Sequence, residues 1–290
     1  MPSPRSVVTD VELVAFLQRV LPRIGMRWSG FRRVRGQVRK RLARRVQGLG
    51  LGDLGEYEAY LGTHPGEWDV LDGLCRITIS RFYRDRAVFD ALRDPILPDL
   101  ARSARDRGER TLRAWSVGCA SGEEPYTLSM CWAFDASEGS PGVALEVVAT
   151  EVDAVLLERA RRACYGRGSL RELPSEWIDR AFDVADGTLC LRPYLRHPVR
   201  FLPGDVRQET PDGPFDLVLC RNLVFTYFTP SLQAVLLERI LRLMGPAAVL
   251  VLGSHESLPQ GRWPLERPLG ALPIHRLSMG SQRPKPAGGR

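Results

Sequence analysis

The chain has 290 residues, of which 44% are hydrophobic and 26% are charged. These are the proportions of a soluble globular protein with one or two domains. No apolar run reaches the roughly 18 residues of a membrane span, and no apolar signal-peptide core follows Met1-Pro-Ser-Pro-Arg5. We therefore expect a cytoplasmic protein with no membrane insertion.

The six cysteines are scattered and include no Cys-x-x-Cys pair. We expect them to be reduced and mostly buried, as is usual in the cytosol. The four histidines stand far apart in the sequence. No cluster of zinc ligands is therefore apparent, and we expect no metal.

The net charge of +7 is unevenly distributed along the chain. No acidic residue occurs between Glu12 and Asp53, and this interval holds eleven arginines and lysines. Those eleven charges exceed the whole net charge, so the basic field is a local feature. A partner for this region should be acidic.

Residues 1–75 are predicted to form a small, basic, helical domain. Apolar residues recur at helical spacing in four segments: 9–26, 31–49, 53–61 and 64–74. In the second segment Val34, Val38, Leu42 and Val46 form one apolar stripe, and arginines occupy the remaining faces. A solvated helix face is one interpretation of these charges. Arginine rather than lysine, without acids, favours a docking face for a polyanion or an acidic helix.

Residues 76–110 are predicted to be a linker with a connecting helix at 87–101 and a charged loop at 102–110. From residue 111 to 280, strands and helices alternate, which indicates a parallel sheet with right-handed crossovers. The expected strands are 112–117, 144–149, 199–202, 215–220 and 247–252, and the expected helices are 122–134, 154–164 and 230–243. Residues 165–198 interrupt the pattern as a small β excursion, with a helix at 173–178 and a hairpin at 187–194. We expect residues 281–290 to be a disordered tail.

A glycine turn between the first strand and its helix is the main candidate site. Gly118-Cys-Ala-Ser-Gly122 permits unusual dihedrals and close backbone approach to a ligand. Ser121 followed by Glu124 fits a capping box. The turn carries Glu123 and Glu124, so a ligand with a cation or hydroxyls is expected rather than a phosphate. The amino and sulfonium groups of S-adenosylmethionine fit this expectation.

Polar residues also follow the next strands, at the edge where parallel sheets bind ligands. Glu151 could accept both ribose hydroxyls of a nucleoside, or it could be a solvated loop acid. Asp205 could bind an adenine amino group, or it could cap a helix. Asn222 could face the reacting group, or it could simply form a turn. Arg84 lies outside the predicted sheet domain, and taken alone it is better explained as a surface arginine.

Several motifs in one order resemble the CheR-type chemotaxis receptor methyltransferases. They are Thr78-Ile-Ser-Arg-Phe-Tyr-Arg84, Gly118-Cys-Ala-Ser-Gly-Glu-Glu-Pro-Tyr-Thr127, Ala149-Thr-Glu-Val-Asp153, Cys220-Arg-Asn-Leu-Val-Phe-Thr-Tyr-Phe228 and Leu252-Gly-Ser-His-Glu-Ser257. The resemblance covers roughly residues 10–277. It implies a Rossmann-like class I methyltransferase sheet, a small all-α N-terminal domain and a short β excursion.

The resemblance also implies a cofactor and the residues that bind it. The cofactor is S-adenosylmethionine, and Glu123 would hold its methionine amino group while Glu151 holds the ribose. The full set of implied cofactor-binding residues is Thr78, Ser80, Arg84, Gly118, Glu123, Glu151, Asp205, Val206, Asn222 and Leu223.

The reaction implied by the family is methyl transfer to glutamate side chains of chemoreceptors. Arg84 is the implied contact for the substrate carboxylate, and Tyr227 is a candidate to orient the acceptor oxygen. A carboxylate is already ionised at neutral pH, so proximity and charge compensation are sufficient and no general base is needed. The implied partner is an acidic chemoreceptor helix docked by the Arg-rich helix at 31–49.

The sequence departs from the family pattern in several places. Glu151 stands where the family usually has Asp, Thr78 and Asp205 where it has Asn or a similar residue, and Ser80 where it has Thr. The Tyr227-Phe228 pair comes one residue late after the Arg-Asn motif. Because this tyrosine lies on the acceptor side, the departure concerns the acceptor rather than the cofactor.

Two other functions are compatible with the same cofactor site. The first is methylation of a different acceptor, a small molecule or RNA. The basic helix suits RNA, but no aromatic stacking surface accompanies it, so nucleic acid is disfavoured. The second is a catalytically silent sensor of S-adenosylmethionine, and the presence of Arg84 together with Glu123 argues against it.

Overall fold

The computed structural model describes residues 8–278, which divide into two compact units. Unit 1 contains residues 8–78 and 226–233, and unit 2 contains residues 79–225 and 234–278. The tail predicted at 281–290 lies outside the described residues. Within 8–278, no helix combines the length and the apolar character that crossing a membrane requires.

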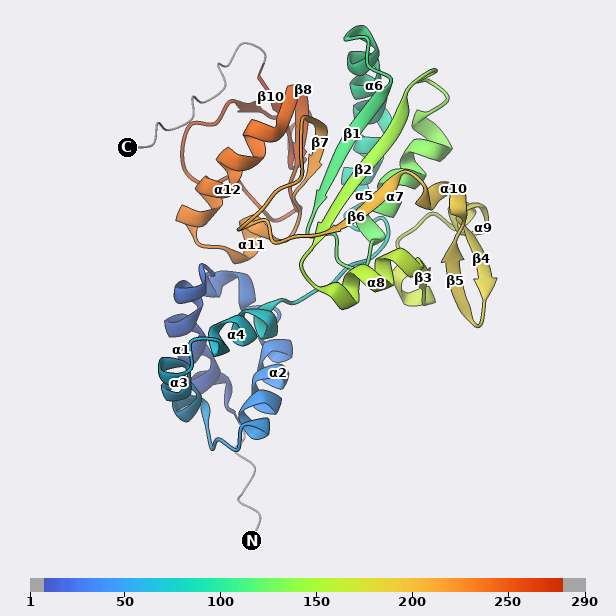
Figure 1. The fold of residues 1–290 in the computed structure, drawn as a ribbon. Helices are drawn as coiled ribbons and strands as arrows, with labels where there is room; N and C mark the ends of the chain where they lie inside the picture. The colour runs from blue at the N-terminus through green and yellow to red at the C-terminus, as the bar shows by residue number, and fades with distance from the viewer. Residues whose placement is uncertain (1–7, 279–290) are drawn as a thin grey trace. The chain divides into compact units, whose positions relative to one another are not determined.

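Unit 1 is helical (Figure 1). Its elements are α1 (Asp10–Val20), the 3-10 helices η1 (Leu21–Ile24) and η2 (Trp28–Phe31), α2 (Arg35–Gly48), α3 (Leu54–Thr63) and α4 (Glu67–Cys75). Thr9 and Glu12 form a full capping box at the start of α1. On α2 the buried residues are Val38, Leu42 and Val46, as the apolar stripe predicts. The helix predicted at 31–49 begins later, because Val34 has a non-helical backbone.

A later segment of the chain, residues 226–233, completes unit 1. The Arg27 amide donates to the Tyr227 carbonyl at 2.8 Å, and the Thr229 amide donates to the Gly25 carbonyl at 2.9 Å. Gly30 packs directly on the backbone of Thr226, where any Cβ would clash. This segment therefore belongs to the helical unit, although it follows the sheet strand that ends at Leu219.

Unit 2 is built on a seven-stranded sheet, and its α/β class agrees with the prediction (Figure 1). The strand order is β6-β2-β1-β7-β8-β10-β9, and the first five strands are parallel. Those five are the ones predicted from the sequence. Their bounds are β1 (Thr111–Val117), β2 (Ala144–Glu151), β6 (Val199–Pro203), β7 (Phe215–Leu219) and β8 (Met244–Val251), and β9 (Leu265–Glu266) and β10 (Ile274–Leu277) complete the sheet.

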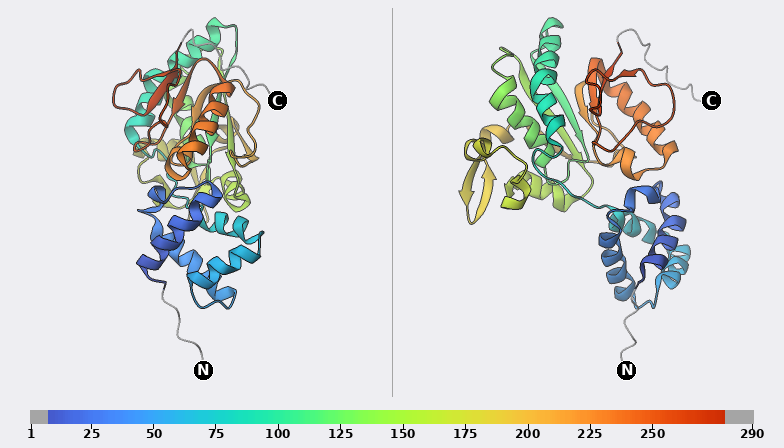
Figure 2. Two further views of the ribbon diagram at one scale, coloured as in Figure 1. Left: turned by 90° about the vertical axis from the view of Figure 1, so that its left-hand side faces the viewer. Right: turned by 180° about the vertical axis from the view of Figure 1, so that it is seen from behind.

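Helices cover both faces of this sheet, with α6 and α7 on one face and α12 on the other (Figures 1 and 2). The helices of unit 2 include α5 (Arg86–Ala91), α6 (Leu97–Asp106), α7 (Glu123–Cys131), α8 (Ala154–Arg162), α9 (Ser175–Ala181), α10 (Pro193–Arg196), α11 (Val224–Tyr227) and α12 (Pro230–Leu243), with π-helical turns η3 (Leu92–Ile96) and η4 (Trp132–Ala136). Thr226 and Tyr227 of α11 and residues 230–233 of α12 belong to unit 1. The loop predicted at 102–110 is wrong for residues 102–106, because buried Ala104 continues the apolar face of α6. Residues 107–110 lie outside helices and strands, as predicted.

The β excursion is a separate three-stranded sheet. Its order is β3 (Cys164–Tyr165), β5 (Thr188–Leu191) and β4 (Phe182–Ala185), and the 3-10 helix η5 (Arg167–Leu170) lies between β3 and β4 in the chain. The predicted hairpin at 187–194 is therefore displaced. Asp186 and Gly187, with φ of 46° and 73°, form the turn itself, and two left-handed residues are what a tight hairpin turn requires.

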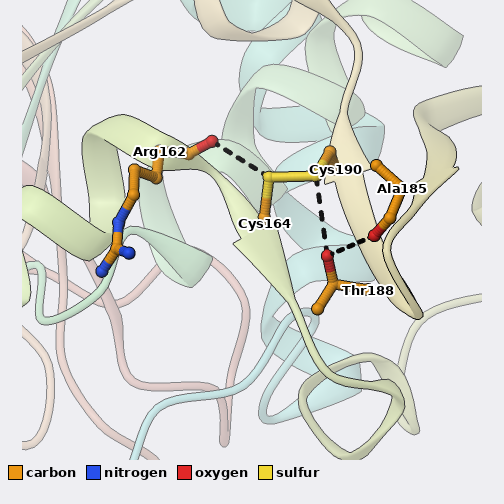
Figure 3. Close-up of a disulfide and its surroundings, with 5 residues drawn as sticks. All are labelled: Arg162, Cys164, Ala185, Thr188 and Cys190. Carbon is orange, nitrogen blue, oxygen red and sulfur yellow. Dashed lines mark hydrogen bonds between the residues drawn. A yellow bond between two sulfur atoms is a disulfide. The ribbon is translucent and has the colours of Figure 1, made fainter.

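The prediction that all cysteines are reduced is wrong for one pair. Cys164 and Cys190 form a disulfide across β3 and β5 (Figure 3). The strand register places these two residues directly opposite each other. The other four cysteines are free and buried.

Candidate functional site

The glycine turn follows β1 at the carboxyl end of the sheet. Gly118 has φ of 71°, and a Cβ there would lie only 2.5 Å from Leu223 Cδ2. Gly122 is also left-handed, with φ of 91°, and is the N-cap of α7. The amides of Gly118 and Cys119 both donate to the Thr150 carbonyl at 2.9 Å. The turn is thus fixed to the end of β2 and cannot carry side chains at its two glycines.

Glu123 provides the clearest sign of a cationic ligand. Its side chain is the first in α7, and the residue is only 2% exposed. Oε1 accepts from Ser121 Oγ at 3.1 Å, whereas Oε2 is buried without a hydrogen-bond partner among residues 8–278. A buried carboxylate oxygen needs a donor. An amino group such as that of S-adenosylmethionine would satisfy it, so the residues present fit this cofactor.

The capping box predicted from Ser121 and Glu124 is wrong. Ser121 turns to Glu123, and no side chain caps α7. Glu124 instead points into the protein, where it accepts from Ser116 Oγ at 2.8 Å and from Arg221 Nη1 at 3.0 Å. The hydroxyl and the buried guanidinium therefore satisfy this carboxylate.

Glu151 joins the glycine turn to the end of β2. Its Oε2 accepts from the Ala120 amide at 3.0 Å, and its Oε1 accepts from the amides of Val152 and Asp153 at 2.8 and 3.0 Å. The side chain therefore has a structural role in shaping the turn. Oε2 accepts only one amide and retains a further lone pair, so ribose binding by Glu151 stays a prediction.

Asp205 follows β6 and is paired inside the chain. Its carboxylate binds the Arg207 guanidinium, with Nη2 2.6 Å from Oδ2, and also accepts from the Arg207 amide at 2.9 Å. The alternative of a helix cap is not what the structure shows, because Asp205 leads into a turn. Val206 is buried beside it. Adenine binding by Asp205 and Val206 stays a prediction.

Asn222 follows β7 in a left-handed conformation, with φ of 57°. Its amide donates to Glu256 Oε2 at 2.8 Å, and the Gly253 amide donates to the same oxygen at 2.7 Å. Glu256 thereby joins the loops that follow β7 and β8. We had not singled out Glu256 from the sequence, although it lies inside the Gly-Ser-His-Glu-Ser motif.

Arg84 is brought to the site by the segment before α5. Its neighbours Tyr83 and Asp85 are both left-handed, with φ of 57° and 65°. Arg84 Nη1 donates to the Ile79 carbonyl at 2.6 Å, and Nη2 lies 3.5 Å from Asn222 Oδ1. The fold thus places a cation next to the end of β7. Ser80 lies in the same segment, and its cofactor role stays a prediction.

A buried ion cluster lies behind Arg84 and the glycine turn. The Arg221 side chain is 2% exposed and binds both Glu124 and Asp85, with Nη2 2.7 Å from Asp85 Oδ2. Nη2 also donates to the Arg84 carbonyl at 2.9 Å. Burial raises the pKa of the Glu124 carboxyl, and the charge of Arg221 opposes that shift. Sequence reasoning missed this cluster, although Arg221 is the arginine of the Cys-Arg-Asn motif.

Two predicted site residues belong to unit 1. Thr78 is the last residue of the first segment of that unit. Tyr227 has its ring centroid 5.0 Å from that of Phe31, and Arg27 donates to its carbonyl. The roles proposed for Thr78 and Tyr227 stay predictions. Within the described residues, no group of three or more His, Cys, Asp or Glu side chains is placed to hold a metal ion.

Comparison with known proteins places this site in one family. The family model for the CheR methyltransferase SAM-binding domain matches residues 78–267. The chemotaxis protein methyltransferase of Escherichia coli (strain K12) is 32% identical over 261 residues, covering 87% of this chain and 86% of that protein. Chemotaxis protein methyltransferase 2 of Pseudomonas aeruginosa is 31% identical, covering 76% and 78%. The probable biofilm formation methyltransferase WspC of Pseudomonas aeruginosa is 33% identical, covering 81% of this chain and 58% of that protein. The chain belongs to the CheR methyltransferase family and is a methyltransferase that uses S-adenosylmethionine.

Proposed function

We propose that this chain methylates glutamate side chains of a chemoreceptor-type protein, forming methyl esters. The observation that carries the proposal is Arg84, a cation held 3.5 Å from Asn222 at the carboxyl edge of the sheet. The glycine turn beside this edge is acidic, so an arginine here suits an anionic acceptor rather than the cationic cofactor. The names of the chemotaxis relatives support the same acceptor class.

The cofactor would be held by the residues of the glycine turn and the strand ends. Glu123 Oε2 would offer its buried charge to the amino group, and the lack of a side chain at Gly118 lets Leu223 pack against the turn. We assign the ribose to Glu151 and the adenine side to Asp205 and Val206. Leu223, which packs on Gly118, would line the cofactor together with Asn222.

S-adenosylmethionine supplies a methyl group made electrophilic by its sulfonium. Arg84 would bind the acceptor carboxylate and compensate its charge. Asn222 and the linker residues Thr78 and Ser80 would hold the reactants in line. No general base is needed, because a glutamate side chain is ionised at neutral pH. Tyr227 remains our candidate for orienting the acceptor oxygen.

We propose α2 as the docking element for an acidic receptor helix in the cytoplasm. Several of its arginines are used inside unit 1, because Arg35 and Arg39 pair with Asp10, and Arg45 pairs with Glu67. Lys40 and Arg44 are exposed on α2 and have no acidic partner among residues 8–278. These two residues therefore leave a free cationic face.

Reversing the charge of this face should weaken the encounter with the receptor. For Lys40→Glu with Arg44→Glu we expect kcat/KM for a receptor fragment to fall roughly tenfold at low salt and less at high salt. The control is Arg102→Glu with Arg105→Glu on α6, which changes the net charge equally. An equal loss in both double variants would show that net charge, not α2, attracts the substrate.

The acceptor class can be tested directly with methyl-labelled S-adenosylmethionine and a purified chemoreceptor cytoplasmic fragment. We expect label on the fragment that mild alkali releases as methanol, because a methyl ester hydrolyses while an N-methyl group does not. Replacing the methylated glutamates with alanine should remove the label. Alkali-stable label, or label on RNA in a lysate, would contradict the proposal.

A further inference from the structure

Arg221 lies at the centre of the buried ion cluster and makes contacts with three separate parts of unit 2. Its Nη1 reaches Glu124 on α7 at 3.0 Å, and its Nη2 reaches Asp85 at 2.7 Å. The same Nη2 donates to the Arg84 carbonyl at 2.9 Å, and the guanidinium lies 5.0 Å from the ring centroid of Phe89. With the side chain 2% exposed, these contacts take place out of water.

Burying charged groups costs desolvation free energy, so stability alone does not explain this cluster. A buried ion pair is often no more stabilising than apolar residues of the same volume. What this cluster does provide is a fixed backbone. Tyr83 and Asp85 are both left-handed, a conformation that non-glycine residues adopt only when surrounding contacts hold them. Arg221 binds the carbonyl of the peptide that joins Arg84 to Asp85, and it also binds the Asp85 carboxylate.

Further contacts make the same segment part of the strand-end architecture. Asp85 Oδ1 accepts from Ser254 Oγ at 3.1 Å, in the loop after β8. The Tyr83 amide donates to Thr127 Oγ1 on α7 at 3.1 Å. Glu124, on the other side of Arg221, directly follows Glu123 in the chain. The guanidinium therefore couples the position of Arg84 to the helix that begins at the cofactor turn.

We propose that Arg221 is a positioning residue for methyl transfer, which fixes the Tyr83–Asp85 segment so that the Arg84 guanidinium faces the end of β7. The proposal rests on the function proposed above, because it takes Arg84 as the acceptor contact. Lysine at position 221 would keep the charge but lose the planar fork that reaches Glu124, Asp85 and the Arg84 carbonyl together.

The principal variant is therefore Arg221→Lys. We expect kcat with a receptor fragment to fall about 10- to 100-fold, since small displacements of a reacting group have effects of that size. The dissociation constant of S-adenosylmethionine should change less than about threefold, because the side chain of Arg221 bonds to Glu124, Asp85 and the Arg84 carbonyl and not to Glu123 or Glu151. Combined with Arg84→Ala, Arg221→Lys should add almost no further loss, because it acts through Arg84.

A matched control exists at the opposite end of β7. Arg107 also pairs with a buried carboxylate, that of Asp216, with Nη2 2.5 Å from Oδ1. Arg107→Lys should lower the melting temperature, although less than Arg221→Lys because the Arg107 side chain is 26% exposed, and it should leave kcat unchanged. This control shows whether weakening a buried ion pair elsewhere in unit 2 is enough to lower kcat.

The rate of amide hydrogen exchange reports how firmly residues 79–88 are held, and it can be measured without a methyl acceptor. In Arg221→Lys we expect faster amide exchange in residues 79–88 and unchanged exchange in β1 and β2, whereas Arg107→Lys should not alter 79–88. Asp85→Asn, which removes only one partner of Arg221, should show a smaller effect in the same segment and serves if Arg221→Lys does not fold. Unchanged exchange at 79–88 would overturn the proposal.

The two proposals fail in different ways. If Arg84→Ala lowers kcat but Arg221→Lys multiplies that loss independently, Arg221 is not a positioning residue for Arg84 and the proposed function stands. If Arg84→Ala leaves kcat unchanged, Arg84 is not the acceptor contact, and the positioning role falls with it even if exchange at 79–88 increases.

Discussion

Glu123→Ala should weaken the binding of S-adenosylmethionine by about 100-fold or more. Removing one partner of a buried charge pair costs roughly 2–5 kcal/mol, and the Oε2 atom of Glu123 is buried with no other partner in residues 8–278. The Glu123→Gln variant should also bind S-adenosylmethionine weakly, because glutamine retains the shape of the side chain but not its negative charge. Isothermal titration calorimetry with S-adenosylmethionine or S-adenosylhomocysteine measures both variants.

Two further variants show whether the loss of cofactor affinity is specific to carboxylates at the site. Glu158→Ala removes an exposed carboxylate from α8 and should leave the affinity unchanged. Glu151→Ala should also abolish binding, with the added loss of the Ala120 contact that shapes the turn. Unchanged affinity in Glu123→Ala would refute the cofactor site described here.

Arg84→Ala should lower kcat by about 100-fold or more while the cofactor affinity changes only a few-fold. Removing one preorganised donor from a reacting anion typically has an effect of this size, and Arg84 lies next to Asn222 rather than to Glu123. Arg84→Lys should recover part of the activity, because it restores the charge without the two-nitrogen fork. Single-turnover kinetics with a receptor fragment separates the chemical step from binding.

Arg86→Ala is the matched control for Arg84. Arg86 is exposed and lies two residues further along the chain, so its loss should leave kcat unchanged. If Arg84→Ala instead weakened cofactor binding more than it lowered kcat, Arg84 would be a cofactor residue and the acceptor would be held by other groups.

The parts of the site that the sequence predicts are those encoded by neighbouring residues. A strand, two glycines and a carboxylate within residues 112–123 indicate the cofactor turn, and the structure has the strand, the turn and the buried Glu123 there. The alternation of strands and helices likewise indicates a parallel sheet. Periodicity and turn chemistry are local, so they can be read without knowing which segments meet.

The parts that could not be predicted depend on contacts between distant residues. Arg221 and Glu124 are 97 positions apart, and Arg221 and Asp85 are 136 apart. In the sequence, each of these three residues looks like an ordinary surface charge. The pairing of the arginines on α2 could not be predicted either. The number of charges in the sequence does not show that Arg45 forms an ion pair with the buried Glu67.

The disulfide between Cys164 and Cys190 has a consequence for the covalent connectivity of the β excursion. The two cysteines are 26 positions apart, and the exposed turn at Asp186 and Gly187 lies between them. A protease that cleaves once in this turn would leave the two fragments joined through sulfur. The break would go unnoticed on a denaturing gel until a thiol reductant separated the pieces.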